Sequence, residues 1–267
     1  MSAGLLPRRQ PTPSVVPLLL SFTAGFVDSC TALALFGLFV AQVTGSFVLV
    51  ARAFVTHEQG ATISMLAIPV FFLSAALTTA LAAVVARRGH SALSWALGLE
   101  CAMLTAFVMV ALASAPISDP NAEATLAASL LGLFAMGVQS ATVRLLMNNV
   151  ASTNVMTTNT TQIAIDATEL LLAWLACRTR SDAAAVSALQ RSLARVASLF
   201  TVVLGFLLGT IAGTLAYMAT GLWGLLAPLI IMYGMFGWSR TLPPGADLPG
   251  EPHALPGREE GGRLPQP

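Results

Sequence analysis

Six apolar stretches of about 20 residues or more constrain this chain more than any other feature. They cover residues 15–37, 61–86, 91–114, 124–147, 196–219 and 220–239. An α-helix rises about 1.5 Å per residue, so each stretch is long enough to cross the hydrocarbon core of a bilayer. The chain is 56% hydrophobic and only 9% charged, whereas a soluble domain carries about 25% charged residues. We therefore predict an all-α, polytopic transmembrane helical bundle of about six spans, with the lipid bilayer as its main partner.

One membrane domain lies between two polar tails. Residues 1–14 and 241–267 are rich in proline and polar side chains, which is typical of disorder, and the domain covers 15–240. An acidic loop at 115–123 divides the domain into halves at 15–114 and 124–239. The first apolar stretch is too long for the core of a cleavable signal peptide, so we interpret it as an uncleaved span. The net charge of +1 argues against a nucleic acid partner.

Two polar interruptions occupy matching positions in the two halves. Gly25 precedes Thr44-Gly45-Ser46 by nearly the same spacing as Gly137 precedes Thr157-Thr158-Asn159. The segments that begin at these interruptions, 40–56 and 153–177, either cross the membrane or re-enter it. Repeated units with broken helices that meet in the membrane recur in transporters and channels.

The positions of the arginines favour six spans over eight. With six spans, Arg8, Arg9, Arg87, Arg88, Arg240 and the arginine-rich loop at 178–195 all lie on one side, and the acidic loop lies on the other. Eight spans would move Arg87 and Arg88 outside and would make the halves parallel. Three spans per half is an odd number, so the six-span interpretation predicts inverted halves with both termini in the cytoplasm.

The residues around both interruptions resemble the YoaK-like family of bacterial multi-pass membrane proteins, a family of unknown function. The matching residues are Gly25, Asp28, Phe39-Val40-Ala41 and Thr44-Gly45 in the first half, and Gly137, Gln139, Arg144, Thr153 and Thr157 in the second. Ser46, Ser140 and Thr158 depart from the family pattern. The resemblance covers residues 15–240. It implies about six spans and a location in the bacterial inner membrane, and it implies no substrate.

Two acids lie deep within apolar spans. A charged side chain at the bilayer centre costs at least about 2.5 kcal/mol, and such residues tend to mark solute or proton pathways. Asp28 is therefore either a coupling or substrate-binding carboxylate or an acceptor for backbone N–H groups that the nearby interruption exposes. Glu100 either shares a proton with Asp28 or bonds to a neighbouring helix.

The two interruptions offer hydroxyls and free backbone groups. A helix that starts at such a point directs its N–H groups and its positive dipole end into the membrane, which suits an anion or a polar solute. Thr, Ser and Asn are also ordinary helix N-caps. We interpret Gln139 as lying at the level of Asp28 in the repeat. The predicted solute or ion path contains Asp28, Thr44, Gly45, Ser46, Glu100, Gln139, Thr157 and Asn159.

Two further groups are assigned to structure. Gly205, Gly209 and Gly213 recur every four residues and let helix backbones approach closely, within the bundle or between protomers of a homo-oligomer. Asp166 and Glu169 share a helix face, and Arg144 is their predicted partner in an ion-pair cluster.

No motif indicates an enzyme, a metal site or a cofactor. The chain has no HExxH, P-loop or GxSxG pattern. Cys30, Cys101 and Cys177 each lie in an apolar run without the spacing of a metal site or a disulfide framework. We therefore predict a membrane protein that passes a small polar solute or protons through a central polar site. The alternative is a non-transporting membrane scaffold or assembly partner.

Overall fold

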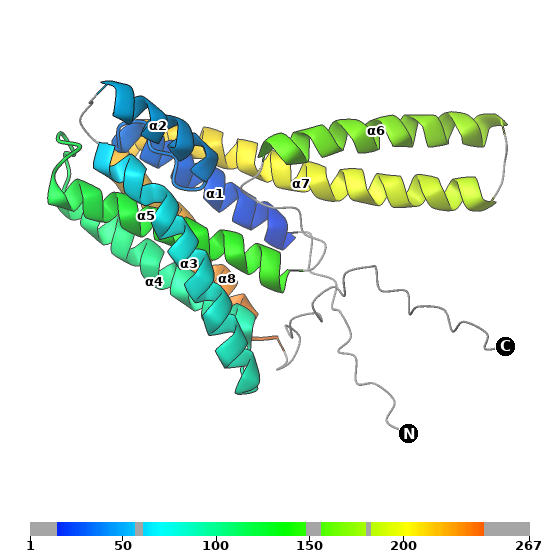
Figure 1. Ribbon diagram of the computed structural model, residues 1–267. Coiled ribbons are helices and arrows are strands. Elements are labelled where there is room, and N and C mark those ends of the chain that lie inside the picture. Colours follow the sequence, from blue (N-terminus) through cyan, green and yellow to red (C-terminus); the bar gives the residue numbers. More distant parts are fainter. Residues whose placement is uncertain (1–14, 57–60, 148–155, 180–182, 243–267) are drawn as a thin grey trace, which may run out of the picture.

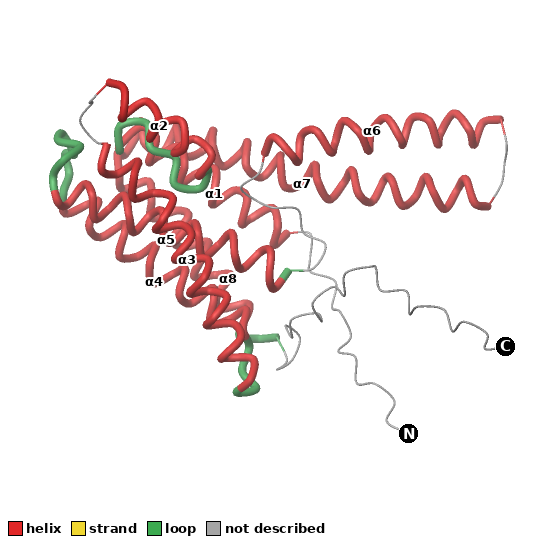
Figure 2. Tube along the Cα trace, in the orientation of Figure 1, coloured by secondary structure: helices red, strands yellow, loops and turns green. Residues whose placement is uncertain are grey.

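The structure is a computed structural model, and it describes residues 15–56, 61–147, 156–179 and 183–242. All secondary structure in these residues is helical (Figures 1 and 2). The helices are α1 (Val15–Ala34), α2 (Val43–Thr56), α3 (Ala61–Arg87), α4 (Ala92–Ala113), α5 (Glu123–Leu146), α6 (Met156–Thr179), α7 (Ala183–Thr220), the 3₁₀ helix η1 (Gly221–Leu225) and α8 (Leu226–Ser239). The predicted tail at 1–14, and all of the tail at 241–267 beyond Leu242, lie outside the described residues.

Five helical stretches are long and apolar enough to cross a membrane, which confirms the predicted polytopic bundle. The last of them, Ser192–Ser239, contains the end of α7, η1 and α8. Gly221 opens η1 with a φ of +63°, a left-handed conformation that glycine adopts without strain. The chain turns here, because α8 packs against α4 and α1 and makes no contact with α7. This stretch therefore forms two helices, α7 and α8, which the turn at η1 separates.

Helix directions follow from residue-by-residue contacts. α7 runs parallel to α1, since Gly205, Gly209 and Gly213 meet Leu18, Phe22 and Phe26 in the same order. α8 runs antiparallel to α4: the Ser94 hydroxyl, near the start of α4, donates to the carbonyl of Ser239 at the end of α8 (3.0 Å). Helix α1 starts and helix α8 ends toward the same end of the bundle (Figure 1).

The two halves make corresponding contacts. In the first half Gly25 of α1 lies against α7, where an added Cβ would collide with the carbonyl of Phe206. In the second half Gly137 of α5 lies against α3, where a Cβ would collide with the hydroxyl of Ser74. The glycines that match in the sequence are therefore both points of close helix contact, each between the first helix of one half and the third helix of the other.

The second helix of each half packs against the third helix. Among the described elements, α2 contacts α3 alone and α6 contacts α7 alone. The second-half pair is much longer: α6 has 24 residues against 14 in α2, and α7 has 38 against 27 in α3. The α6–α7 hairpin consequently projects beyond the bundle (Figure 1).

The loop predicted at 178–195 is wrong over most of its length. α6 continues to Thr179 and α7 begins at Ala183. The segment AAAVSALQRSLAR at the start of α7 is rich in Ala, Leu and Arg, which are strong helix formers. Its arginines indicated an exposed segment, and its helix propensity makes that segment helical.

Candidate functional site

The chain breaks after α1, and this break positions Asp28. Phe36 and Gly37 have positive φ values of 56° and 83°, and they turn the chain back toward α1. The following residues, Leu38 to Ala41, run as an irregular and largely buried segment to the start of α2. The break therefore precedes Thr44-Gly45-Ser46, which form the first turn of α2 instead of interrupting a helix.

Asp28 closes this break with a hydrogen bond. The backbone N–H of Ala41 donates to Asp28 Oδ1 at 2.6 Å, and the N–H of Val40 and the side chain of Gln42 face the same carboxylate. Asp28 is 2% exposed, and its Oδ2 has no hydrogen-bond partner within the described residues. Asp28 is thus an acceptor for the backbone that the break exposes.

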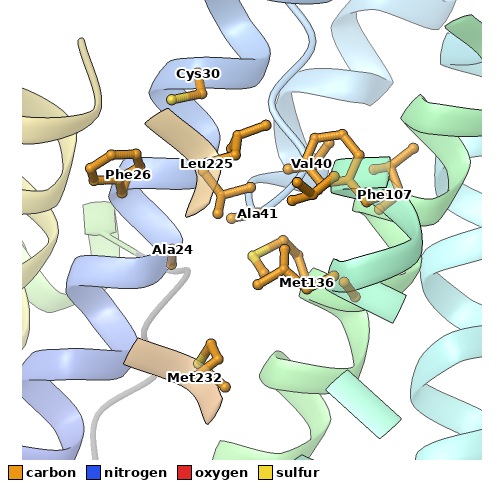
Figure 3. Packing of buried hydrophobic residues seen from close by; sticks show 14 of the residues in the cluster. Ala24, Phe26, Cys30, Val40, Ala41, Phe107, Met136, Leu225 and Met232 are labelled. Atoms are coloured by element: carbon orange, nitrogen blue, oxygen red, sulfur yellow. The ribbon is translucent and has the colours of Figure 1, made fainter. Parts of the chain in front are cut away.

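The segment held by Asp28 also contacts the second half. A Cβ added to Gly132 of α5 would lie 3.3 Å from Val40 and 3.5 Å from the ring of Phe107 of α4. Figure 3 shows Val40 beside Phe107 in the interior. We call the residues Asp28, Val40, Ala41, Phe107 and Gly132 the Asp28 level.

A second buried polar group lies elsewhere on α1. Gln139 of α5 donates from Nε2 to the carbonyl of Leu20 at 2.8 Å, and its Oε1 has no partner among the described residues. Glu100 of α4 is fully buried, and neither of its carboxylate oxygens has a partner in the described part of the chain. We call Leu20, Glu100 and Gln139 the Glu100 level.

Helix geometry places Glu100 and Gln139 opposite each other. α4 and α5 are joined by the short loop at 114–122 and run side by side, so they are antiparallel (Figure 1). Phe107 of α4 meets Gly132 of α5. Glu100 precedes Phe107 by seven residues and Gln139 follows Gly132 by seven, which is about two helical turns in each case. Glu100 therefore shares a face with Phe107, Gln139 shares a face with Gly132, and the two side chains fall at one height.

The two levels are separated along the bundle. Seven residues of α4 or α5 span about 10 Å, and the eight residues from Leu20 to Asp28 on α1 span about 12 Å. These two independent routes agree. The prediction that Gln139 lies at the level of Asp28 is wrong, because α1 and α5 run in opposite directions: Asp28 lies at the height of Gly132, and Gln139 lies at the height of Leu20.

One turn of fully buried apolar residues lies between the levels. This turn contains one residue from each helix: Ala24 of α1, Leu104 of α4 and Met136 of α5. Each lies four residues after one level and three or four residues before the other along its helix, and each is 0% exposed. Figure 3 shows Ala24 and Met136 below the Val40–Ala41 segment. Two buried hydroxyls of α1, Ser21 and Thr23, lie within this stretch and also lack partners among the described residues.

The remaining predicted path residues do not join either level. Thr44 is exposed, Gly45 is partly exposed, and Ser46 is buried, all in the first turn of α2. Thr157 is exposed and Asn159 is buried in the first turn of α6. Since α2 and α6 make no contact with α1, α4 or α5, or with each other, the structure does not bring the two interruptions to Asp28.

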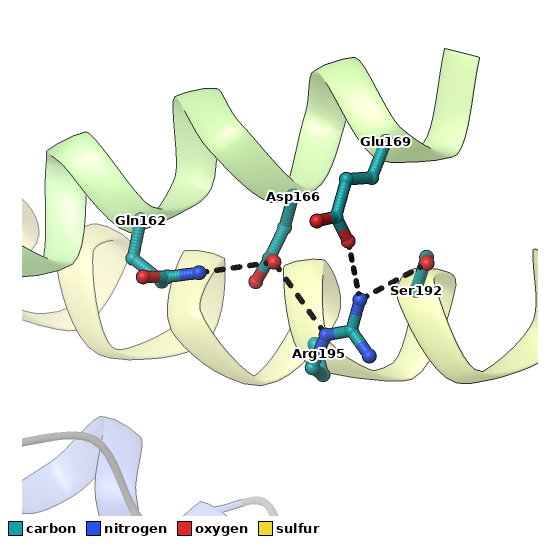
Figure 4. Close-up of polar contacts among 5 residues, drawn as sticks. All are labelled: Gln162, Asp166, Glu169, Ser192 and Arg195. Carbon is teal, nitrogen blue, oxygen red and sulfur yellow. Dashed lines mark hydrogen bonds and ion pairs between the residues drawn. The ribbon is translucent and has the colours of Figure 1, made fainter. Parts of the chain in front are cut away.

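The acidic pair of α6 contacts a different arginine from the one predicted. Arg195 of α7 lies 2.8 Å from Glu169 Oε2 and 3.5 Å from Asp166 Oδ1 (Figure 4). Gln162 also donates to Asp166 at 3.0 Å. Arg144 is exposed at the end of α5, and α6 leaves the bundle to pack against α7, so the nearest cation comes from α7. Sequence reasoning missed Arg195 because it placed that residue in a loop.

The glycine ridge packs within the chain. A Cβ on Gly205 would lie 2.6 Å from the carbonyl of Leu18, one on Gly209 would collide with the carbonyl of Phe22, and one on Gly213 would lie 2.5 Å from that of Phe26. The close partner of α7 is therefore α1 and not α8. Within the described residues, no three His, Cys, Asp or Glu side chains group closely enough to hold a metal ion.

Comparison with known proteins yields one match. A family model with the description "Protein of unknown function (DUF1275)" matches residues 16–238, which is nearly the whole membrane domain. No curated protein and no solved structure matches the chain.

Proposed function

The chain belongs to the DUF1275 family of proteins of unknown function, and from this premise we propose that it moves a small polar solute across the membrane that its helices span. The observation that carries the proposal is Glu100. A carboxyl group in the interior of a membrane bundle, with no partner among the described residues, is costly and tends to be kept where a solute or proton passes.

The arrangement of the two levels supports a solute path that passes two polar sites. The Asp28 and Glu100 levels lie about 10–12 Å apart on the same three helices, and one turn of apolar side chains separates them. Helix breaks and buried polar groups near the midplane are common in transporters built from inverted repeats. In this proposal Ala24, Leu104 and Met136 form the closed layer, and a solute crosses it when these helices shift. The chain acts without a catalytic step, cofactor or metal.

Flux through purified protein tests this proposal. The full chain is reconstituted into liposomes, and uptake of radiolabelled ammonium analogues, sugars and amino acids, together with proton flux, is compared with protein-free liposomes. We expect at least one solute to enter faster through the protein, and Glu100→Gln to remove that flux. Flux that is unchanged in Glu100→Gln would remove Glu100 from the path. The same outcome in Asp28→Asn would remove Asp28.

The membrane and orientation form a finer part of the proposal. The YoaK-like resemblance and the side occupied by the arginines favour a bacterial inner membrane with both termini in the cytoplasm. Single cysteines at positions 57 and 119, in a background without native cysteines, are then expected to react with an impermeant thiol reagent added to the outside of cells. Labelling of either position only from the cytoplasm would contradict the six-span orientation.

The α6–α7 hairpin favours a second candidate function, an assembly partner. Leu171, Leu172 and Trp174 are exposed on α6 at 54%, 61% and 45%, in a part of the hairpin that contacts no other described helix. Replacement of Leu171 and Leu172 by Gln is expected to abolish any stable complex isolated in mild detergent if this candidate is correct, without a change in solute flux. A complex that survives the replacement would argue against it.

A further inference from the structure

We infer that the Glu100 level binds a small cation that donates several hydrogen bonds, of the ammonium or primary alkylammonium class. This inference deepens the proposed function by giving the class of solute, and it rests on that function only for transport. Binding at the Glu100 level can be measured with no flux at all, so the two ideas can fail separately.

The free side-chain atoms of the Glu100 level are all hydrogen-bond acceptors. The carbonyl of Leu20 can only accept a hydrogen bond, so the amide of Gln139 must present its NH₂ group there and its oxygen elsewhere. The free atoms at this level are therefore Gln139 Oε1, Glu100 Oε1 and Glu100 Oε2. All three are oxygens that accept hydrogen bonds, so what completes this level must be a donor.

The residues that carry these oxygens share one height in the bundle. Glu100 and Gln139 lie at one height on facing sides of two antiparallel neighbours, as the contact between Phe107 and Gly132 shows two turns away. Both side chains are 0% exposed. In proteins, the great majority of buried polar atoms are hydrogen-bonded, and a buried carboxylate without a partner is among the costliest exceptions.

No positive charge of the described residues pairs with the Glu100 level. The ion pairs of the described residues both involve Arg195, which lies in the α6–α7 hairpin. The basic residue nearest to this level along α5 is Arg144, which is exposed. Within the part of the chain that the structure describes, no basic side chain pairs with Glu100. A cationic solute would balance the carboxylate and would gain from the weak dielectric screening around it.

The candidate cations differ in how many hydrogen bonds they can donate to this level. A proton on Glu100 supplies one donor, which can pair one Glu100 oxygen with Gln139 Oε1, but it leaves the other Glu100 oxygen without a donor and brings no charge to balance a carboxylate. A primary alkylammonium supplies three donors and ammonium supplies four, which is enough for the three free acceptors at this level. Ca²⁺ and Mg²⁺ take about six or more oxygen ligands, and this level offers too few. The apolar layer of Leu104 and Met136 next to the level favours a small ion that sheds its water.

The test measures binding of methylammonium to the purified full chain in detergent. The readout is the shift that methylammonium causes in the midpoint of thermal unfolding. Methylammonium chloride is compared with tetramethylammonium chloride, which has the same charge and no N–H donor, and with sodium chloride at equal ionic strength. The variants are Glu100→Gln, which keeps the shape of the side chain, and Glu169→Gln, the same change in an exposed carboxylate of the hairpin. Size-exclusion chromatography verifies that each variant is folded.

We expect methylammonium alone to raise the midpoint, saturably, in the natural chain and in Glu169→Gln. Loss of a charged acceptor should weaken the affinity for methylammonium about tenfold or more in Glu100→Gln. Equal shifts with tetramethylammonium, or an unchanged shift in Glu100→Gln, would overturn the inference. If Glu100→Gln does not fold, Gln139→Leu replaces it. That variant removes one of the three acceptors, so an undiminished shift would also overturn the inference.

Liposome uptake of ¹⁴C-methylammonium then separates the inference from the proposed function. Binding that depends on Glu100, without uptake, would support the site and contradict transport. Proton flux that depends on Glu100, without methylammonium binding, would support transport and overturn the choice of an ammonium. Binding and uptake that are both lost in Glu100→Gln would support the two together.

Discussion

The Asp28 level and the Glu100 level use the same three helices and differ in what completes them. At the Asp28 level, the chain folds back after α1 and supplies a backbone N–H from Ala41 to the carboxylate at 2.6 Å. At the Glu100 level, Gln139 bonds to α1 through its NH₂ group, and both oxygens of Glu100 are without partners among the described residues.

This difference divides the roles that depth alone would give to both acids. A carboxylate that accepts from an exposed backbone N–H stabilises the break, because the N–H would otherwise be buried without a partner. A carboxylate to which the protein donates no hydrogen bond does not stabilise the fold. Its presence is better explained by a ligand. Asp28 therefore belongs to the fold, with a secondary place in the path, and Glu100 belongs to the proposed function.

The largest expected effect comes from a change that disturbs both levels together. Gly209→Val places side-chain atoms where the carbonyl of Phe22 lies, and it forces α1, which carries both Asp28 and Leu20, away from α7. Overpacking typically costs about 1–3 kcal/mol, and a clash with backbone atoms should place the loss of unfolding free energy at the upper end, about 3 kcal/mol. Unfolding in mixed detergent and SDS micelles measures it. Gly234→Val is the matched control, because no atom lies within 4 Å of an added Cβ there, and a similar loss in both variants would contradict the contact.

The next largest loss of stability is expected at Asp28, in a direct comparison with Glu100. Asp28→Ala leaves the N–H of Ala41 buried without its acceptor, so we expect a loss of about 1–3 kcal/mol. Glu100→Gln removes no hydrogen bond that the described residues make and replaces an unpartnered carboxyl group by a neutral amide, so we expect no loss of unfolding free energy. The same micelle titration measures both. A larger loss for Glu100→Gln than for Asp28→Ala would reverse the roles assigned here.

These roles show how far the sequence could predict the structure. The length of the apolar runs predicted the bundle because a hydrocarbon solvent leaves few alternatives to helices. The acid in the first run and the nearby break were both visible, and the hydrogen bond between them was one of two alternatives. Sequence spacing could not show that the break begins at Phe36, because the turn there depends on positive φ values and not on a Thr-Gly pair.

The errors have physical causes that sequence spacing does not express. Gly25 and Gly137 match in the sequence and directly follow Ala24 and Met136 of the apolar layer, but α1 and α5 run in opposite directions. Asp28 and Gln139 therefore lie on opposite sides of that layer, and Gln139 was expected at the wrong level. The pairing of Glu100 with Gln139 depends on the register of α4 against α5, which the contact between Phe107 and Gly132 determines. Arg195 was missed because charge indicated a loop where Ala and Leu favour a helix.

A smaller loss of stability is expected at Gln139, the side chain of the Glu100 level that makes a hydrogen bond. Gln139→Met keeps the length of the side chain and removes the hydrogen bond to the carbonyl of Leu20, so we expect a loss of about 0.5–1.5 kcal/mol. It also removes one free acceptor, so methylammonium binding should weaken at the same time. The pair of measurements distinguishes this level from the Asp28 level, where a loss of stability should leave binding intact. A loss above about 3 kcal/mol would mean that Gln139 stabilises the bundle in another way.

The smallest effect should come from the α6–α7 hairpin, which contacts neither level. Arg195 is 49% exposed and Glu169 55%, so their ion pair is worth at most about 1 kcal/mol, although Asp166 at 3% exposure loses a cation as well. Arg195→Ala should therefore increase hydrogen exchange in residues 156–179 and 183–195, and this increase should be smaller in high salt because screening already weakens the pair. Methylammonium binding should not change. Altered binding would mean that the hairpin is coupled to the Glu100 level through α7 and α1, and the separation of the two polar levels from the rest of the molecule would then have to be abandoned.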